Sequence, residues 1–118
     1  MATLVHFDIS ADDAERAKAF YEKLFDSKIE KLPGPMNYYL VGTNDLKGNP
    51  GIGGGLAKRE AGRGSGIVNY MGVASIDVTL KQVIELGGKI LQPVQPVPCY
   101  GLLSVCADTE NNIFGVFE

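Results

Sequence analysis

The sequence contains one pattern twice, and a repeat of this size constrains the fold more than any single residue does. Residues 5–28 begin with a strand pattern and continue into a helical run, and residues 67–90 repeat that order. Each copy has the pattern of a strand, a turn, an amphipathic helix and then further strands. We therefore expect two equivalent modules, in which His6 and Val68 occupy matching positions.

The first strand of the first copy alternates strictly between apolar and polar side chains. Val5, Phe7 and Ile9 form one face, and His6, Asp8 and Ser10 form the other. Asp12 followed by Glu15 is the pattern of a capping box, which predicts a helix start. The helix should cover the apolar face of the strand, so the polar face is expected to point away from it.

The remaining pattern completes two βαβββ modules, which is an α+β fold. Strands are predicted at residues 36–41, 52–58, 67–73, 89–94, 100–107 and 112–117. Ser75 should begin the second helix, and Gly87 and Gly88 should end it. We expect a single domain, with module 1 at about residues 1–58, a linker at about 59–66 and module 2 at about 67–118.

The composition is that of an ordinary globular domain. Of the 118 residues, 45% are apolar and 21% are charged, so the chain can bury a core and is not disordered. A net charge of −3 and dispersed basic residues argue against nucleic-acid binding. No apolar run suits a membrane span, and no signal peptide is recognised. Two cysteines, Cys99 and Cys106, without CxxC spacing indicate free thiols in the cytoplasm.

Three segments resemble the vicinal oxygen chelate superfamily of glyoxalase I, extradiol dioxygenases and bleomycin-resistance proteins. They are residues 6–25 with Phe20-Tyr21, residues 85–90, and the Asp-Thr-Glu-Asn-Asn-Ile-Phe-Gly run at 108–115. The resemblance implies paired βαβββ modules and a homodimer. In metal-dependent members, four strand positions hold a divalent metal ion.

The metal positions that the resemblance implies carry a single donor in this sequence. They fall at His6, near Gly53, at Val68 and near Gly115, and only His6 has a side chain that can bind a metal. Useful affinity needs three or more protein ligands. We therefore expect no metal and no cofactor, which makes metal-dependent glyoxalase or dioxygenase activity doubtful and leaves open whether the protein is an enzyme.

The expected ligand site is a cup formed by the two modules on the faces away from both helices. The residues predicted to form it are His6, Asp8, Gly53, Val68, Tyr70, Tyr100 and Gly115. The glycines are expected to leave room for a ligand, and only one of Tyr38 and Tyr39 can face it. His6 is also a candidate catalytic residue.

Three functions fit this prediction. The first is metal-independent binding of a small organic molecule, as in bleomycin-resistance proteins. The second is a glyoxalase-like lyase or isomerase that uses His6 as acid and base. The third is an assembly or regulatory module whose cup is filled by its own side chains.

Overall fold

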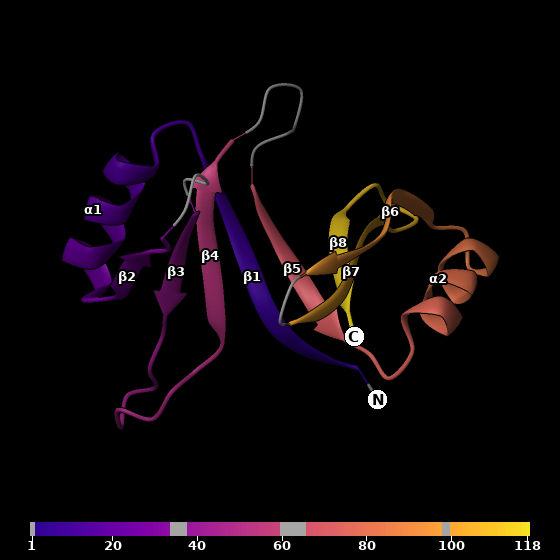
Figure 1. The fold of residues 1–118 in the computed structure, drawn as a ribbon, viewed down its shortest axis with the longest axis horizontal. Coiled ribbons are helices and arrows are strands. Elements are labelled where there is room, and N and C mark those ends of the chain that lie inside the picture. The colour runs from indigo at the N-terminus through magenta and orange to yellow at the C-terminus, as the bar shows by residue number, and fades with distance from the viewer. Residues whose placement is uncertain (1, 34–37, 60–65, 98–99) are drawn as a thin grey trace. The chain divides into compact units, whose positions relative to one another are not determined.

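The computed structural model describes residues 2–33, 38–59, 66–97 and 100–118, and its elements follow the order βαβββ twice (Figure 1). The first set is β1 (Thr3–Ala11), α1 (Ala14–Phe25), β2 (Lys28–Lys31), β3 (Tyr38–Gly42) and β4 (Gly53–Lys58). The second set is β5 (Ile67–Gly72), α2 (Ile76–Glu85), β6 (Lys89–Val97), β7 (Gly101–Ala107) and β8 (Ile113–Phe117). The predicted α+β fold is confirmed, and β2 is a strand to which the sequence pattern gave no range. Most of the predicted linker, residues 60–65, lies outside the described residues.

The chain divides into two compact units with the same topology. The N-terminal unit is His6–Ile67, and the C-terminal unit is Val68–Glu118 together with the first five residues. Strands of the N-terminal unit are ordered β2-β3-β4-β1, and those of the C-terminal unit β6-β7-β8-β5. In both, the first strand of the module pairs in parallel with the fourth, and the other pairs are antiparallel.

The core of the N-terminal unit lies between α1 and one face of its strands (Figure 1). Its buried residues are Ile29, Tyr39, Val41 and Leu56, and Phe7, Ile9, Ala11, Ala14, Ala17 and Tyr21 pack against them. Val5 was predicted to share this face but is 40% exposed and lies in the other unit. The apolar alternation therefore identified the helix side of β1 correctly only from Phe7 onward.

The first helix begins one residue later than the sequence pattern predicts. Its N-cap is Asp13, whose carboxylate accepts a hydrogen bond from the backbone N–H of Arg16 at 3.0 Å. Asp12 instead accepts a hydrogen bond from the Arg59 guanidinium at 2.9 Å, and Glu15 accepts one from the hydroxyl of Tyr39. A tertiary partner for each of these acidic side chains replaces the predicted capping box.

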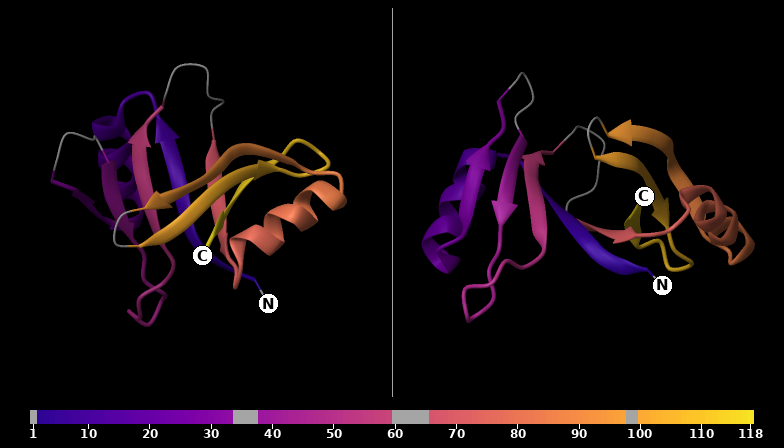
Figure 2. Two further views of the ribbon diagram at one scale, coloured as in Figure 1. Left: turned by 45° about the vertical axis from the view of Figure 1, so that its right-hand side comes forward. Right: turned by 60° about the horizontal axis from the view of Figure 1, so that its bottom comes forward.

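The core of the C-terminal unit is built in the same way around α2. Ile76, Leu80, Cys106 and Val116 are its buried residues, and Figure 2 shows α2 running alongside β6 and β7. The predicted N-cap is confirmed, because Ser75 accepts a hydrogen bond from the N–H of Val78 at 3.3 Å. Gly87 follows the helix with a φ of 95°, which is the left-handed conformation expected of a glycine stop.

Cys106 lies inside this core as a free thiol. It is fully buried, and burial raises the pKa of its thiol. A buried thiol of raised pKa is poorly nucleophilic, which argues against a catalytic role for Cys106. Cys99 lies outside the described residues. Within the described ranges, neither helix is long and apolar enough to span a membrane.

One loop structure occurs in both units. In Asp45–Asn49 and again in Asp108–Asn112, the aspartate Oδ1 accepts hydrogen bonds from the backbone N–H groups two and four residues later, at 2.8–2.9 Å. The asparagine at the fifth position donates from its side chain to the aspartate Oδ2. The fourth residue has positive φ, 88° at Gly48 and 64° at Asn111. The loops before β4 and β8 are therefore two copies of one motif.

Candidate functional site

The face of the N-terminal unit turned away from α1 carries two cross-strand rows. The strand register places Lys28 opposite Gly42 and His6 opposite Gly53, and its next step places the two glycines side by side. This first row therefore has a cation at one end, the imidazole at the other and no side chain between. The second row runs from Glu30 through Leu40 and Gly55 to Asp8.

Three polar side chains meet at the β1 end of these rows. The Tyr38 hydroxyl donates to Oδ1 of Asp8 at 2.8 Å, and Nε2 of His6 lies 3.0 Å from the same oxygen. The Tyr38 hydroxyl and Nε2 of His6 are 3.2 Å apart. The side chains of His6 and Asp8 remain about one-third exposed, at 33% and 34%. Solvent or a ligand can therefore reach this His6–Asp8–Tyr38 cluster.

The tyrosine that joins the cluster is Tyr38, whereas the neighbouring Tyr39 points into the helix-covered core. Tyr39 is 3% exposed and donates its hydroxyl hydrogen to Glu15. That hydrogen bond to a carboxylate is the chief reason why the pKa of Tyr39 is raised above its ordinary value. The sequence predicted that only one of the pair could face the site, and the register decides which one.

Glycine is required beneath the cluster. A Cβ atom built on Gly55 would overlap the Tyr38 hydroxyl and approach Oδ1 of Asp8 to 2.5 Å. Gly115 in the C-terminal unit has the same role, because a Cβ there would overlap the ring of Tyr70. The absence of a side chain lets each tyrosine lie directly on the strand.

This geometry corrects the expected pairing of glycines. Asp8 and Tyr70 each lie five residues before a helix N-cap, and they stand opposite Gly55 and Gly115 respectively. The counterpart of Gly115 is therefore Gly55 and not Gly53. His6 and Val68 do match, since each lies seven residues before its N-cap. The space expected above Gly115 is occupied by Tyr70, which is 8% exposed.

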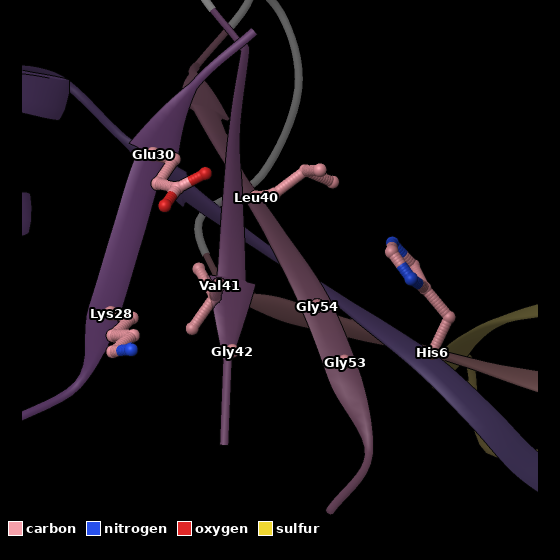
Figure 3. A pocket seen from close by; sticks show the side chains of 8 residues that line it. All are labelled: His6, Lys28, Glu30, Leu40, Val41, Gly42, Gly53 and Gly54. Carbon is pink, nitrogen blue, oxygen red and sulfur yellow. The ribbon is translucent and has the colours of Figure 1, made fainter. Parts of the chain in front are cut away.

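A pocket of about 370 Å³ opens over the first row of the N-terminal unit (Figure 3). It is lined by His6, Lys28, Glu30, Leu40, Val41, Gly42, Gly53 and Gly54. Gly53 has open space above it, since a Cβ there would have the carbonyl oxygen of Val41 as its nearest neighbour, at 3.9 Å. Figure 3 shows His6 standing at one side of the glycine floor and Lys28 and Glu30 at the other.

The other predicted site residues lie in the C-terminal unit. Tyr70 and Gly115 are register partners on β5 and β8, and Val68 lies two residues before Tyr70. Tyr100 is 71% exposed at the turn before β7. A cup shared by both modules stays a prediction. In the N-terminal unit, His6, Asp8 and Gly53 are brought together as expected.

Sequence reasoning missed three features of the N-terminal unit: Tyr38 as a partner of His6, Gly55 beneath Tyr38, and the side of the pocket formed by Lys28 and Glu30. The alternation Lys-Ile-Glu-Lys at 28–31 contains a usable signal, since it places Lys28 and Glu30 on one face around the buried Ile29. Their position relative to His6 depends on the pairing of four strands, which no local pattern reveals.

The donor set does not fit a divalent metal ion. Opposite His6 stands Gly53, and the position opposite Asp8 cannot carry a ligand side chain because Tyr38 covers Gly55. The matching strands of the C-terminal unit offer Val68, Tyr70 and Gly115. Nowhere in the described ranges do three or more His, Cys, Asp or Glu side chains gather as a metal site would require.

Comparison with known proteins gives a family and a fold. The family model described as Glyoxalase/Bleomycin resistance protein/Dioxygenase superfamily matches residues 3–116. No curated protein matches the chain at a significant level.

Three similar solved structures illustrate the fold. A hypothetical protein of Bacillus halodurans C-125 has a TM-score of 0.72 at 16% identity, covering 99% of this chain and 94% of that one. A variant of Streptomyces coelicolor methylmalonyl-CoA epimerase, in complex with 2-nitronate-propionyl-CoA, has a TM-score of 0.70 at 15% identity, covering 96% and 94%. A superfamily member from Vibrio splendidus 12B01 has a TM-score of 0.68 at 13% identity, covering 98% and 97%. At these identities the likeness shows the fold alone.

Proposed function

Because the chain belongs to the Glyoxalase/Bleomycin resistance protein/Dioxygenase superfamily, we propose that it binds a small organic molecule, without a metal ion, in the pocket beside His6. The observation that carries this proposal is the glycine floor of Gly42 and Gly53, which ends at the His6–Asp8–Tyr38 cluster. A sheet face with two neighbouring glycines gives a ligand close access to the backbone.

The dimensions and lining of the pocket support a small ligand. Its volume of about 370 Å³ lies near the lower end of the range common for ligand pockets, roughly 300–1,000 Å³. Leu40 supplies apolar surface, and His6 supplies a polar contact whose orientation Asp8 and Tyr38 hold. A few fixed polar groups in an apolar lining are typical of sites that orient small molecules.

A thermal-shift screen of aromatic antibiotics and small oxo-acids tests the proposal. A ligand of the pocket should raise the melting temperature of the wild type, because binding stabilises the folded state. Gly53→Val fills the floor and should abolish the shift, whereas Ile52→Val, a neighbouring change outside the lining, should leave it intact. A hit that stabilises all three proteins equally would place the ligand elsewhere.

An acid–base lyase or isomerase is a second candidate, favoured by one observation. Both Asp8 and Tyr38 contact Nε2 of His6, which is the arrangement that orients a histidine for proton transfer. Such an enzyme would move a proton of a small oxygenated substrate. The test is exchange of substrate carbon-bound hydrogen in deuterated water, which His6→Ala should abolish and Ile52→Val should not. Lack of exchange with every compound that binds would contradict it.

The quaternary structure that we propose is a homodimer, as the family resemblance implies. Strands β2 and β6 are each an outer strand of their own unit and are poor templates for edge pairing. The first is four residues long and has three charged residues, and the second contains Pro93 and Pro96. Dimerisation through other surfaces is therefore expected. Sedimentation equilibrium measures the mass directly, and a value equal to that of the 12.6 kDa chain would contradict the proposal.

A further inference from the structure

We propose that the ligand of the His6 pocket is a small organic carboxylate, held at its anionic end by Lys28 and at its other end by the His6–Asp8–Tyr38 cluster. This inference rests on the proposed function, because it names the class of ligand for the same pocket. It depends on the two cross-strand rows and on the charged side chains at the β2 end of each.

Lys28 and Glu30 stand side by side at the rim of the pocket with opposite charge. They lie two residues apart on β2 and flank the core residue Ile29, so both side chains project from the face away from α1. Figure 3 shows both of them on the same side of the pocket. Within the described ranges, neither forms an ion pair with another residue. The rim therefore presents a cationic group and an anionic group that a ligand could contact.

The two charged groups differ in their access to the floor. From Lys28, the first row continues over Gly42 and Gly53 to His6 without a side chain in between. In the second row, the neighbour of Glu30 on β3 is Leu40, whose side chain stands in the row. The next position is Gly55 on β4, which is covered by Tyr38. A molecule lying on the glycine floor thus lies in the same row as Lys28, whereas Glu30 lines the pocket from the neighbouring row, where it stands opposite Leu40. The open row favours an anionic ligand over a cationic one.

The length of the row limits the ligand. Lys28 and His6 are three strand spacings apart, which is roughly 14 Å between their Cα atoms. The lysine and imidazole side chains span part of that distance, so a ligand with about two to three carbon–carbon spacings or one aromatic ring between its polar ends can contact both. Leu40 lies beside this path and suits an apolar middle. A carboxylate with a hydroxyl at the far end of an aryl group fulfils these conditions.

The experiment compares 4-hydroxyphenylacetate and benzoate with their methyl esters, which have the same apolar body but no charge. His6 is the only histidine in the chain, so its ring resonances in an NMR titration report binding at the pocket without ambiguity. The acids should shift these resonances and the esters should bind at least tenfold more weakly, because a charge-assisted hydrogen bond is lost. Added salt should weaken only the acids.

Matched lysine variants assign the anionic contact. Lys28→Gln should weaken binding of the acids about tenfold, whereas Lys31→Gln removes the same charge from the opposite face of β2 and should have no effect. Glu30→Gln should strengthen binding of the acids by removing a nearby negative charge. The unfolding midpoint of each variant, measured in urea, shows that the fold is intact.

The possible failures are distinguishable. Equal affinity for acids and esters, or no effect of Lys28→Gln, would overturn the carboxylate inference and leave the proposed function standing. Binding of neutral or cationic compounds from the antibiotic panel, without any carboxylate, would do the same. Both proposals fail if no compound of either set shifts the His6 ring resonances and if Gly53→Val weakens the binding of none of them.

Discussion

One oxygen atom of Asp8 determines how the single histidine is arranged. It accepts the hydroxyl hydrogen of Tyr38 at 2.8 Å and lies 3.0 Å from Nε2 of His6. An ionised carboxylate can only accept hydrogen bonds, so in a neutral ring Nε2 carries the hydrogen. The other ring nitrogen, Nδ1, then holds the lone pair of the neutral ring.

This assignment gives a direct prediction for the tautomer of His6. In neutral imidazole, the nitrogen shifts of the only histidine should show the form with the hydrogen on Nε2. Asp8→Ala removes the acceptor and should give a mixture of tautomers, whereas Asp12→Ala, which removes a carboxylate outside the cluster, should leave the spectrum unchanged. A wild-type ring with its hydrogen on Nδ1 would contradict the geometry.

The glycines beneath Tyr38 and Tyr70 lead to a second prediction about single residues. Gly115→Ala should lower the free energy of unfolding by about 1–3 kcal/mol, because the new methyl group overlaps the ring of Tyr70. Larger residues such as leucine should be worse, contrary to the expectation that Gly115 lines open space. Gly53→Ala is the control, since a methyl group there has no close neighbour and should change stability by about 0.5 kcal/mol or less. Urea denaturation that finds the two variants equally stable would show that Tyr70 does not pack on Gly115.

At the scale of the element, the repeated aspartate loops hold the turns before β4 and β8. The pKa values of Asp45 and Asp108 are lowered from 3.8, chiefly by the hydrogen bond from the backbone N–H of the asparagine four residues later. Both folded pKa values therefore lie below the unfolded ones. The stability that these carboxylates contribute is present above the unfolded pKa and is lost as the pH falls through the folded pKa.

The pH dependence of unfolding tests this role. Asp108→Asn should be less stable than the wild type at neutral pH, because a neutral amide is a weaker acceptor for the loop N–H groups. Its stability should also fall less steeply on acidification, since one depressed pKa is removed. Glu110→Gln changes the same charge in the same loop but leaves the hydrogen bonds of Asp108 intact, so its pH profile should follow the wild type. Parallel profiles for Asp108→Asn and the wild type would show that the loop does not couple folding to protonation.

At the scale of the whole molecule, the two units share a topology but differ in their chemistry. At matching positions, the N-terminal unit has His6 and Asp8 where the C-terminal unit has Val68 and Tyr70. The polar cluster and the described pocket of the proposed function thus belong to one unit, and the tyrosine-covered glycine occurs in both.

The donor set leads to a prediction for the purified protein. It should contain no stoichiometric transition metal, and a chelator should leave its melting temperature unchanged, because a metal that stabilised the folded state would make unfolding chelator-sensitive. Elemental analysis and thermal unfolding with and without chelator measure both quantities. About one tightly bound metal per chain, lost together with stability in His6→Ala, would contradict the prediction.

The sequence by itself determined the elements and their repetition. Alternation along residues 5–10 and helical spacing after Ser75 are local patterns, set by which side chains must leave water, so they could be interpreted without a structure. His6 and Asp8 were found in the same way, from the alternation along the first strand, whereas Gly53 was predicted from the metal positions that the family resemblance implies.

Only the tertiary structure decided which residues surround His6. Tyr38 and Tyr39 are equivalent in the sequence pattern, and the pairing of β3 with β4 places Tyr38 over Gly55. Lys28 reaches the pocket through the register of four strands, two of which are separated from it by long stretches of chain. A shift of one residue in any pair would turn these side chains to the opposite face, and that register is fixed by the packing of the whole core.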